Sequence, residues 1–431
     1  MTPAWLGDTS PAHLKRRSRQ ETRAKPMPAV YHGWWVVAGL FLILTVSSGF
    51  GFYNHSVYLN ALSTDGAFSV ANVSVAISFY FLAGGVAGIG VARLIDRVEV
   101  RRIMIVGAAI AGIALALLGQ ARELWQLHGL FMLFGIGNTG VSIVIATTLV
   151  TRWFPGRNRS IALSLASTGL SVGGMVFTPM TALLLERMAF DLVALGLGVA
   201  FFLLTAPVAL LVARLPDAGA EDTTATHEAG PWRLRAALGT RFFVLLTLAY
   251  ILCFLAQVGG IAHLYNYAEA DHGYAIASQA VQVLAIMGVM GRFLGGWLVT
   301  RISIRAFALT CSVLQAAGLA GLALADAPWE VLLAAAAFGA SVGNLLMLQP
   351  LWLAEAFGVK SYPRIFSVAN ACALVGVASG PLLLGQAYAV VGYSVAYLAA
   401  AVTALAAFGC MAAAGHKPAP QAASAGSHPE I

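Results

Sequence analysis

Residues 192–213 read LVALGLGVAFFLLTAPVALLVA, an apolar run without a charged side chain. A helix of about twenty apolar residues spans the ~30 Å hydrocarbon core of a bilayer. Strands of a membrane barrel would instead alternate apolar and polar residues over about ten positions. The run therefore predicts a transmembrane helix, and similar runs recur along the chain.

The composition of the whole chain agrees with this interpretation. Of the 431 residues, 59% are hydrophobic and 10% are charged, whereas a soluble domain carries about a quarter charged residues. We therefore predict an all-α membrane protein with twelve transmembrane helices in two pseudo-symmetric six-helix bundles. The predicted spans are 33–56, 72–94, 102–120, 124–150, 159–185, 190–213, 241–268, 275–299, 305–325, 329–354, 364–390 and 392–414.

The polar segments divide the chain. The longest internal one separates six predicted spans from six, and polar tails precede and follow the spans. We expect a disordered cytoplasmic tail at 1–30, an N-terminal bundle at 31–214, a cytoplasmic linker at 215–240, a C-terminal bundle at 241–415 and a cytoplasmic tail at 416–431.

The positive charges predict the orientation. If the N-terminus is cytoplasmic, 22 of the 25 Lys and Arg residues lie on the cytoplasmic side, two (Arg122 and Arg187) lie opposite, and Arg292 lies inside a span. Cytoplasmic loops of membrane proteins carry such an excess. We expect both termini in the cytoplasm and a location in the plasma membrane, the inner membrane of a bacterium. The net charge of +7 is then a topology signal and not a nucleic-acid site.

The two halves repeat at an offset of about 204 residues. The matched positions are Asp96-Arg97 with Thr300-Arg301, Phe134-Gly135 with Phe338-Gly339, Phe154 with Phe357, and Arg159 with Arg364. A parallel repeat of six-helix halves is typical of transporters, whose substrate site lies near the midplane between the halves.

Three motifs resemble those of a known family. The segment 93–102, RLIDRVEVRR, is similar to the signature between helices 2 and 3 of the major facilitator superfamily, although Ala92 replaces its leading glycine. The segments 32–37, HGWWVV, and 153–162, WFPGRNRSIA, resemble the entries to helices 1 and 5 in its monocarboxylate and oxalate/formate transporters. The resemblance implies the major facilitator fold and a small-molecule carrier.

The first motif also implies a conformational latch. Asp96 lies at a predicted helix end beside Arg97, Arg101 and Arg102, where ion pairs could form in one conformation and break in another. The alternative is a cluster of solvated basic residues that sets topology. The second half has Thr300 in place of the acid.

Arg292 is the most informative residue. It lies about eight residues before the end of the eighth span, roughly 12 Å deep, where a charge is costly unless it faces a cavity or a partner. Its repeat counterpart is Gly88, and no acidic residue lies near mid-depth in the predicted spans. The resemblance implies that this arginine binds a substrate carboxylate; the alternative is a structural arginine paired with a helix end or an acidic side chain.

The charge of the ligand can also be predicted. The oxalate branch that the chain resembles has a second cation on helix 11, but residues 366–376, FSVANACALVG, contain no lysine, and Lys360 precedes them. One buried guanidinium matches a single carboxylate. We therefore expect small monocarboxylates as substrates.

Other polar residues in the predicted spans are less specific candidates for the substrate site. Asn138, Asn344 and Asn370 could bind substrate, although such residues also hold membrane helices together. Tyr53, His55 and Tyr265 could line the pocket or an outer gate, or form an interfacial belt. The acid of proton-linked family members is replaced by Gly288, so His55 and His263 are the possible proton carriers.

The expected function is secondary active transport of organic anions by a monomer in the lipid bilayer, with a coupled proton or counter-anion, or by uniport. The alternatives are efflux of amphipathic drugs or metabolites and a non-transporting receptor in a carrier fold. We find no nucleotide-binding lysine motif, zinc spacing or nucleophile–base pair in the sequence, and therefore expect no enzyme activity, cofactor or metal.

Overall fold

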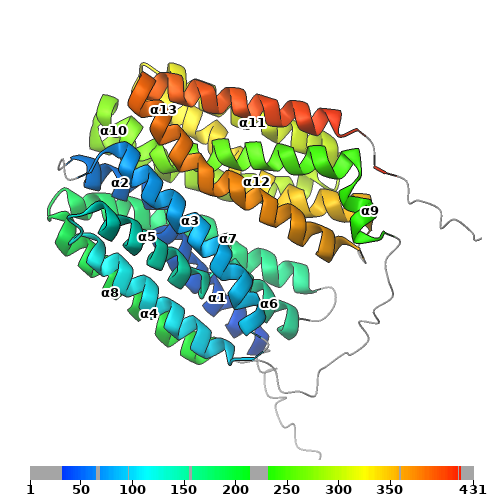
Figure 1. The fold of residues 1–431 in the computed structure, drawn as a ribbon, viewed down its shortest axis with the longest axis horizontal. Coiled ribbons are helices and arrows are strands. Elements are labelled where there is room, and N and C mark those ends of the chain that lie inside the picture. The colour runs from blue at the N-terminus through cyan, green and yellow to red at the C-terminus, as the bar shows by residue number, and fades with distance from the viewer. Residues whose placement is uncertain are drawn as a thin grey trace, which may run out of the picture.

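The computed structural model describes residues 32–64, 68–95, 97–154, 158–213, 232–358, 361–415 and 417–418. Every regular element in these ranges is helical, which confirms the all-α prediction (Figure 1). In the first half the elements are α1 (His32–Ser48), the π-helix η2 (Gly49–Tyr53), α2 (His55–Thr64), α3 (Val70–Leu94), α4 (Val100–Leu118), α5 (Leu124–Thr139), α6 (Ile143–Trp153), α7 (Asn158–Leu185) and α8 (Phe190–Val212). In the second half they are α9 (Leu234–Leu238), α10 (Arg241–Leu298), α11 (Ile304–Leu324), α12 (Pro328–Phe357) and α13 (Tyr362–Ala413).

The described helices are suited to a bilayer. Ten are long and apolar enough to cross one. Large apolar side chains point outward on several of them, for example Leu211 (71% exposed) and Val390 (82% exposed). Water would penalise such exposure, whereas lipid does not.

Two of the ten candidate spans are long enough for two crossings. A straight helix of 58 residues, the length of α10, would extend about 87 Å, nearly three times the hydrocarbon core. Gly273 interrupts α10 with φ 79°, and Gly392 interrupts α13 with φ 78°. Only glycine adopts such a positive φ without strain. Division at these glycines would bring ten spans to twelve, and the count of twelve stays a prediction.

Other predicted boundaries differ from the observed elements. The first span, expected to end at residue 56, continues through α2 to Thr64. The fourth has the predicted bounds as a candidate span, Leu124–Val150, but its helix is interrupted between α5 and α6, where Ser142 caps α6 by accepting a hydrogen bond from the Val144 amide. Short polar side chains at such positions favour helix starts over continuous helix.

Buried side chains gather along each half of the chain. One apolar cluster lies wholly within 36–213. A second lies within 232–414, and a third combines residues of α10–α13 with Tyr53, Val57 and Ala182. We call α1–α8 the first group and α10–α13 the second group. The bounds predicted for the two bundles stay a prediction, and the predicted tails and linker lie largely outside the described residues.

The groups are joined mainly on one face. The chain enters α1 and leaves α13 on the same face, here called the termini face (Figure 1, right); the opposite face carries α2 and the turns at Gly273 and Gly392. Among the described residues, side-chain hydrogen bonds between the groups lie at mid-depth or toward the opposite face. They join Asn60 to Asn266 and Glu269, Ser74 to His263, Ser78 to Leu382, Gln282 to Met175, and Arg292 to Ser167 and Ser171. In this structure the opposite face is therefore closed.

A close helix approach gives the first testable prediction. A Cβ atom on Gly135 of α5 would lie 2.1 Å from the Tyr80 carbonyl oxygen of α3, whereas one on Gly129 of the same helix would meet nothing within 4 Å. Gly135→Ala should therefore destabilise the protein by about 1–3 kcal/mol, seen as a lower melting temperature in detergent. Gly129→Ala is the matched control, and an equal effect of both substitutions would contradict this packing.

Candidate functional site

Arg292 lies on α10 where the second group meets α7 of the first. Its Nη1 donates to Ser171 Oγ at 2.8 Å and, over a longer 3.5 Å, to the Ser167 carbonyl oxygen. Its Nε lies 3.4 Å from the Gly343 carbonyl oxygen of α12. The guanidinium thus contacts both groups at once, as a residue at the substrate site of a two-half carrier must.

The partners of this guanidinium are neutral. No carboxylate oxygen of the described residues lies within 4.0 Å of it, and Nη2 makes no hydrogen bond to them. A part-buried cation in a membrane span is costly without a counter-charge. One edge of the planar fork is available for an anion, and a carboxylate has the matching geometry.

A glycine makes room for the arginine side chain. A Cβ atom on Gly343 would lie 2.7 Å from Arg292 Cγ and 2.4 Å from the Gly288 carbonyl oxygen. Only a residue without a side chain allows the arginine stem to cross α12 at this level. Gly343 therefore positions Arg292 through the absence of a side chain.

Tyr53 lies at the same place. It is the last residue of the π-helix η2, and its ring packs directly over Gly174 of α7. Its hydroxyl lies beside Ser171 and close enough to Arg292 to interact with its charge. Single π-turns inside helices are frequent at functional sites. Of the predicted substrate residues, the structure brings Tyr53 and Arg292 together. Ser171 was not predicted, although it follows the helix 5 motif.

Asn138 belongs to a different network. Its Oδ1 accepts a hydrogen bond from Ser47 Oγ at 2.8 Å, and its Nδ2 donates to the Tyr80 hydroxyl at 2.7 Å. Gly51 keeps this network compact, because a Cβ atom there would meet both Tyr80 and Asn138. The amide thus joins helices of the first group, and its role in substrate binding stays a prediction.

The other two asparagines are placed differently. Asn344 donates to the Ala340 carbonyl oxygen of its own helix at 2.9 Å, and its amide packs against Gly291 and Gly295 of α10. Asn370 is exposed on α13. Neither is among the hydrogen-bond partners of Arg292 in the described chain.

The residues predicted for an outer gate or for proton transfer lie toward the opposite face. His55 is fully buried among aromatic rings, including Tyr80 and Phe131, and its Nδ1 lies 3.2 Å from the Phe52 carbonyl oxygen. Tyr265 is 4% exposed within the apolar cluster that contains Tyr53. His263 is fully buried at the contact between the groups.

The structure describes only some residues of the predicted latch. Asp96 lies outside the described residues. Arg101 and Arg102 form ion pairs with Glu99 at 3.7 and 3.5 Å, at the start of α4, and Arg97 is exposed. Glu99 was not predicted as a partner. These pairs are local to one helix start, so a latch role for the cluster stays a prediction.

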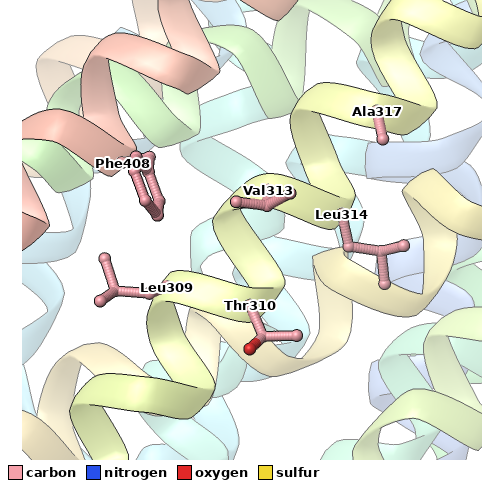
Figure 2. A pocket seen from close by; sticks show the side chains of 6 residues that line it. All are labelled: Leu309, Thr310, Val313, Leu314, Ala317 and Phe408. Carbon is pink, nitrogen blue, oxygen red and sulfur yellow. The ribbon is translucent and has the colours of Figure 1, made fainter.

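An apolar hollow of about 390 Å³ lies elsewhere, between α11 and the end of α13 (Figure 2). Its only hydroxyl, from Thr310, donates to the Ala306 carbonyl oxygen of its own helix. No lining residue is a hydrogen-bond partner of Arg292, so the hollow is not part of this site. It is lined by Leu309, Thr310, Val313, Leu314, Ala317 and Phe408.

Comparison with known proteins agrees with this architecture. The chain is 26% identical over 318 residues to the MFS-type transporter pynF of Aspergillus niger, covering 67% of each chain. It is 26% identical over 334 residues to monocarboxylate transporter 13 of Rattus norvegicus, covering 73% of this chain and 72% of that one.

A solved structure shows the same fold. It is that of a bacterial homolog of the human lysosomal transporter Spinster in an inward-facing, occupied conformation; it superposes with a TM-score of 0.70 at 19% identity and covers 90% of this chain and 97% of that one. The model of the Major Facilitator Superfamily matches residues 41–348, well over half of the sequence. With this match and this fold, the chain belongs to the Major Facilitator Superfamily and is a membrane transporter.

Proposed function

We propose that this transporter carries small organic anions, preferably monocarboxylates, and that Arg292 binds their carboxylate. The observation that supports the proposal most is the guanidinium itself. It lies between the two groups, is held only by neutral acceptors among the described residues, and leaves Nη2 available. A carboxylate can accept from that edge and neutralise the charge.

The same contacts suggest how transport proceeds. Arg292 is held by Gly343 on its own side of the boundary and by Ser171 on the other. A carboxylate at the fork would compete with Ser171 and so weaken a contact between the groups. Rocking of the groups about this point would then expose the site alternately on each side, as in other carriers built from repeats.

The direction of access follows from the closed face. Because the opposite face is closed, we propose that the site is reached from the termini face in this conformation. The excess of Lys and Arg near that face in the sequence supports a cytoplasmic location for it. We further propose an inner-membrane monomer with the bundles, linker and tails predicted above.

The single positive charge of Arg292 favours a substrate with a single negative charge. Arg292 is the only Lys or Arg that lies away from the ends of the predicted spans, so a dicarboxylate would bring one uncompensated charge into the membrane. The name of monocarboxylate transporter 13, a relative at 26% identity, refers to the same substrate class. Tyr53 and the apolar side chains near it would contact the remainder of the acid.

An uptake panel tests the substrate class. Proteoliposomes that contain the purified protein should accumulate short labelled monocarboxylates, with dicarboxylates and neutral amides of the same acids slower by about tenfold or more. A neutral amide lacks the charge that pairs with Arg292, and a dicarboxylate carries a second charge without a partner. The panel is measured with and without a pH gradient and with internal counter-anions, which identifies the coupled ion.

The same panel separates the alternatives. Hydrophobic cations transported faster than acids would indicate an efflux carrier for amphipathic compounds. Saturable binding of an acid without flux would indicate a receptor. Either result would contradict the proposal.

A further inference from the structure

A continuous chain of hydrogen bonds closes the opposite face. It crosses between the groups twice, once from α3 to α10 and once from α2 to α10. Its inner members are buried, with His263 and Ser74 at 0% exposure. In order, the chain runs through Ser74, His263, Tyr393, Asn266, Asn60 and Glu269.

The neighbours of His263 Nε2 determine which ring nitrogen carries the hydrogen. Nε2 lies 3.2 Å from the Pro381 carbonyl oxygen, which can only accept. It also lies 3.2 Å from Ser74 Oγ, whose own hydrogen is donated to the Val70 carbonyl oxygen at 2.6 Å. Both neighbours accept, so Nε2 carries the hydrogen.

The other side of the ring then requires a neutral imidazole. With Nε2 protonated, Nδ1 accepts from the Tyr393 hydroxyl at 3.3 Å. The Tyr393 oxygen accepts in turn from Asn266 Nδ2. Asn266 Oδ1 accepts from Asn60 Nδ2 at 3.1 Å, and Asn60 Nδ2 also donates to Glu269 at 3.2 Å. Every donor hydrogen in this chain of bonds has an acceptor only when Nδ1 carries no hydrogen.

A second proton on His263 is incompatible with this closed chain. A hydrogen on Nδ1 would point at the Tyr393 hydroxyl, whose own hydrogen would lose its acceptor. The imidazolium would also be buried without a neighbouring anion among the residues that the structure describes. The titratable groups facing it are Tyr393 from α13 and, only through Asn266 and Asn60, Glu269 of its own helix; α3 presents the uncharged Ser74. Burial of such a charge is unfavourable.

We propose that His263 is a proton-binding site that is empty when the opposite face is closed and filled when that face opens. The closed arrangement binds fewer protons than the open one, so a fall in pH shifts the population toward the open arrangement. This inference uses the alternating opening of the carrier but not the identity of its substrate, so it can fail or succeed independently of the role of Arg292.

The test measures opening of the opposite face without substrate. Spin labels are attached through Trp125→Cys and Trp329→Cys, exposed positions at the starts of α5 and α12 on that face, after the four native cysteines are replaced by alanine. Pulsed electron resonance distances are recorded in lipid nanodiscs between pH 8 and pH 5. The open-to-closed ratio should rise about tenfold or more across this range, since each differentially bound proton contributes up to tenfold per pH unit.

Histidine variants decide the outcome. His263→Gln can donate and accept as the neutral ring does but cannot gain a proton, so its distance distribution should not change with pH. His272→Gln, a change to a half-buried histidine of the same helix, should retain the wild-type response. If His263→Gln does not fold, His263→Asn replaces it with the same criterion. A pH response that persists in the folded His263 variant, or none in the wild type, overturns the proposal.

Discussion

Arg292→Ala is expected to abolish uptake of labelled monocarboxylates into proteoliposomes. The substitution removes the guanidinium that we propose binds the carboxylate, and loss of one partner of a buried charge pair costs about 2–5 kcal/mol. At 1.4 kcal/mol per factor of ten this corresponds to a reduction of about 30-fold or more. Arg292→Lys should retain partial uptake, because lysine keeps the charge but not the planar fork.

The matched control for charge is Arg122→Ala. Arg122 is exposed on the opposite face, where its guanidinium donates to carbonyl oxygens of the turn before α5. Its loss changes the net charge equally but leaves the proposed site intact. Uptake in Arg292→Ala equal to that in Arg122→Ala would contradict carboxylate binding by Arg292. A melting temperature recorded for each variant separates loss of function from misfolding.

Gly343→Ala should impair transport nearly as strongly as direct loss of the arginine. The new methyl group would overlap Arg292 Cγ, which lies 2.7 Å from the Cβ position, and the guanidinium must then move. A displacement of about 1 Å at a reacting or binding centre can cost about 100-fold. Substrate affinity should fall most, seen as a raised KM for uptake, while the charge of the site is unchanged.

Its control is Gly296→Ala on α10, where a Cβ atom would meet nothing within 4 Å. Normal KM in a folded Gly343→Ala protein would show that the arginine is not constrained as described. If Gly343→Ala does not fold, Ser171→Ala tests the same positioning from the other group. Ser167→Ala is then the control, because Ser167 holds Arg292 only through its backbone oxygen.

The sequence was sufficient for the architecture because lipid imposes simple rules. Apolar runs of about twenty residues, with charges mostly confined to the connections, predict helices, because a helix satisfies all its backbone hydrogen bonds internally in lipid. Arg292 was recognisable for the same reason, since a lone charge in such a run is costly and Gly88 shows that the repeat does not require it. The family motifs then gave the carrier fold.

The contacts of the site could not be predicted from such rules. Ser171 meets Arg292 across 121 positions of sequence, and a serine in a membrane helix has no pattern that marks its partner. Asn138 has the same chemistry in either of its possible roles, and only packing brings Tyr80 and Ser47 to it. The hydrogen-bond directions around His263 depend on the Pro381 carbonyl and on the bond that Ser74 makes to Val70. Residue types alone do not contain that information.

The most direct measurement is a structure of the protein with a transported monocarboxylate bound. We expect the carboxylate oxygens within hydrogen-bond distance, about 2.7–2.9 Å, of the Arg292 guanidinium, with one oxygen on Nη2. The ligand would lie between α7, α10 and η2, close to the Tyr53 hydroxyl. A ligand bound between the two groups without contact to Arg292, which keeps only its bonds to Ser171 and Gly343, would contradict the account.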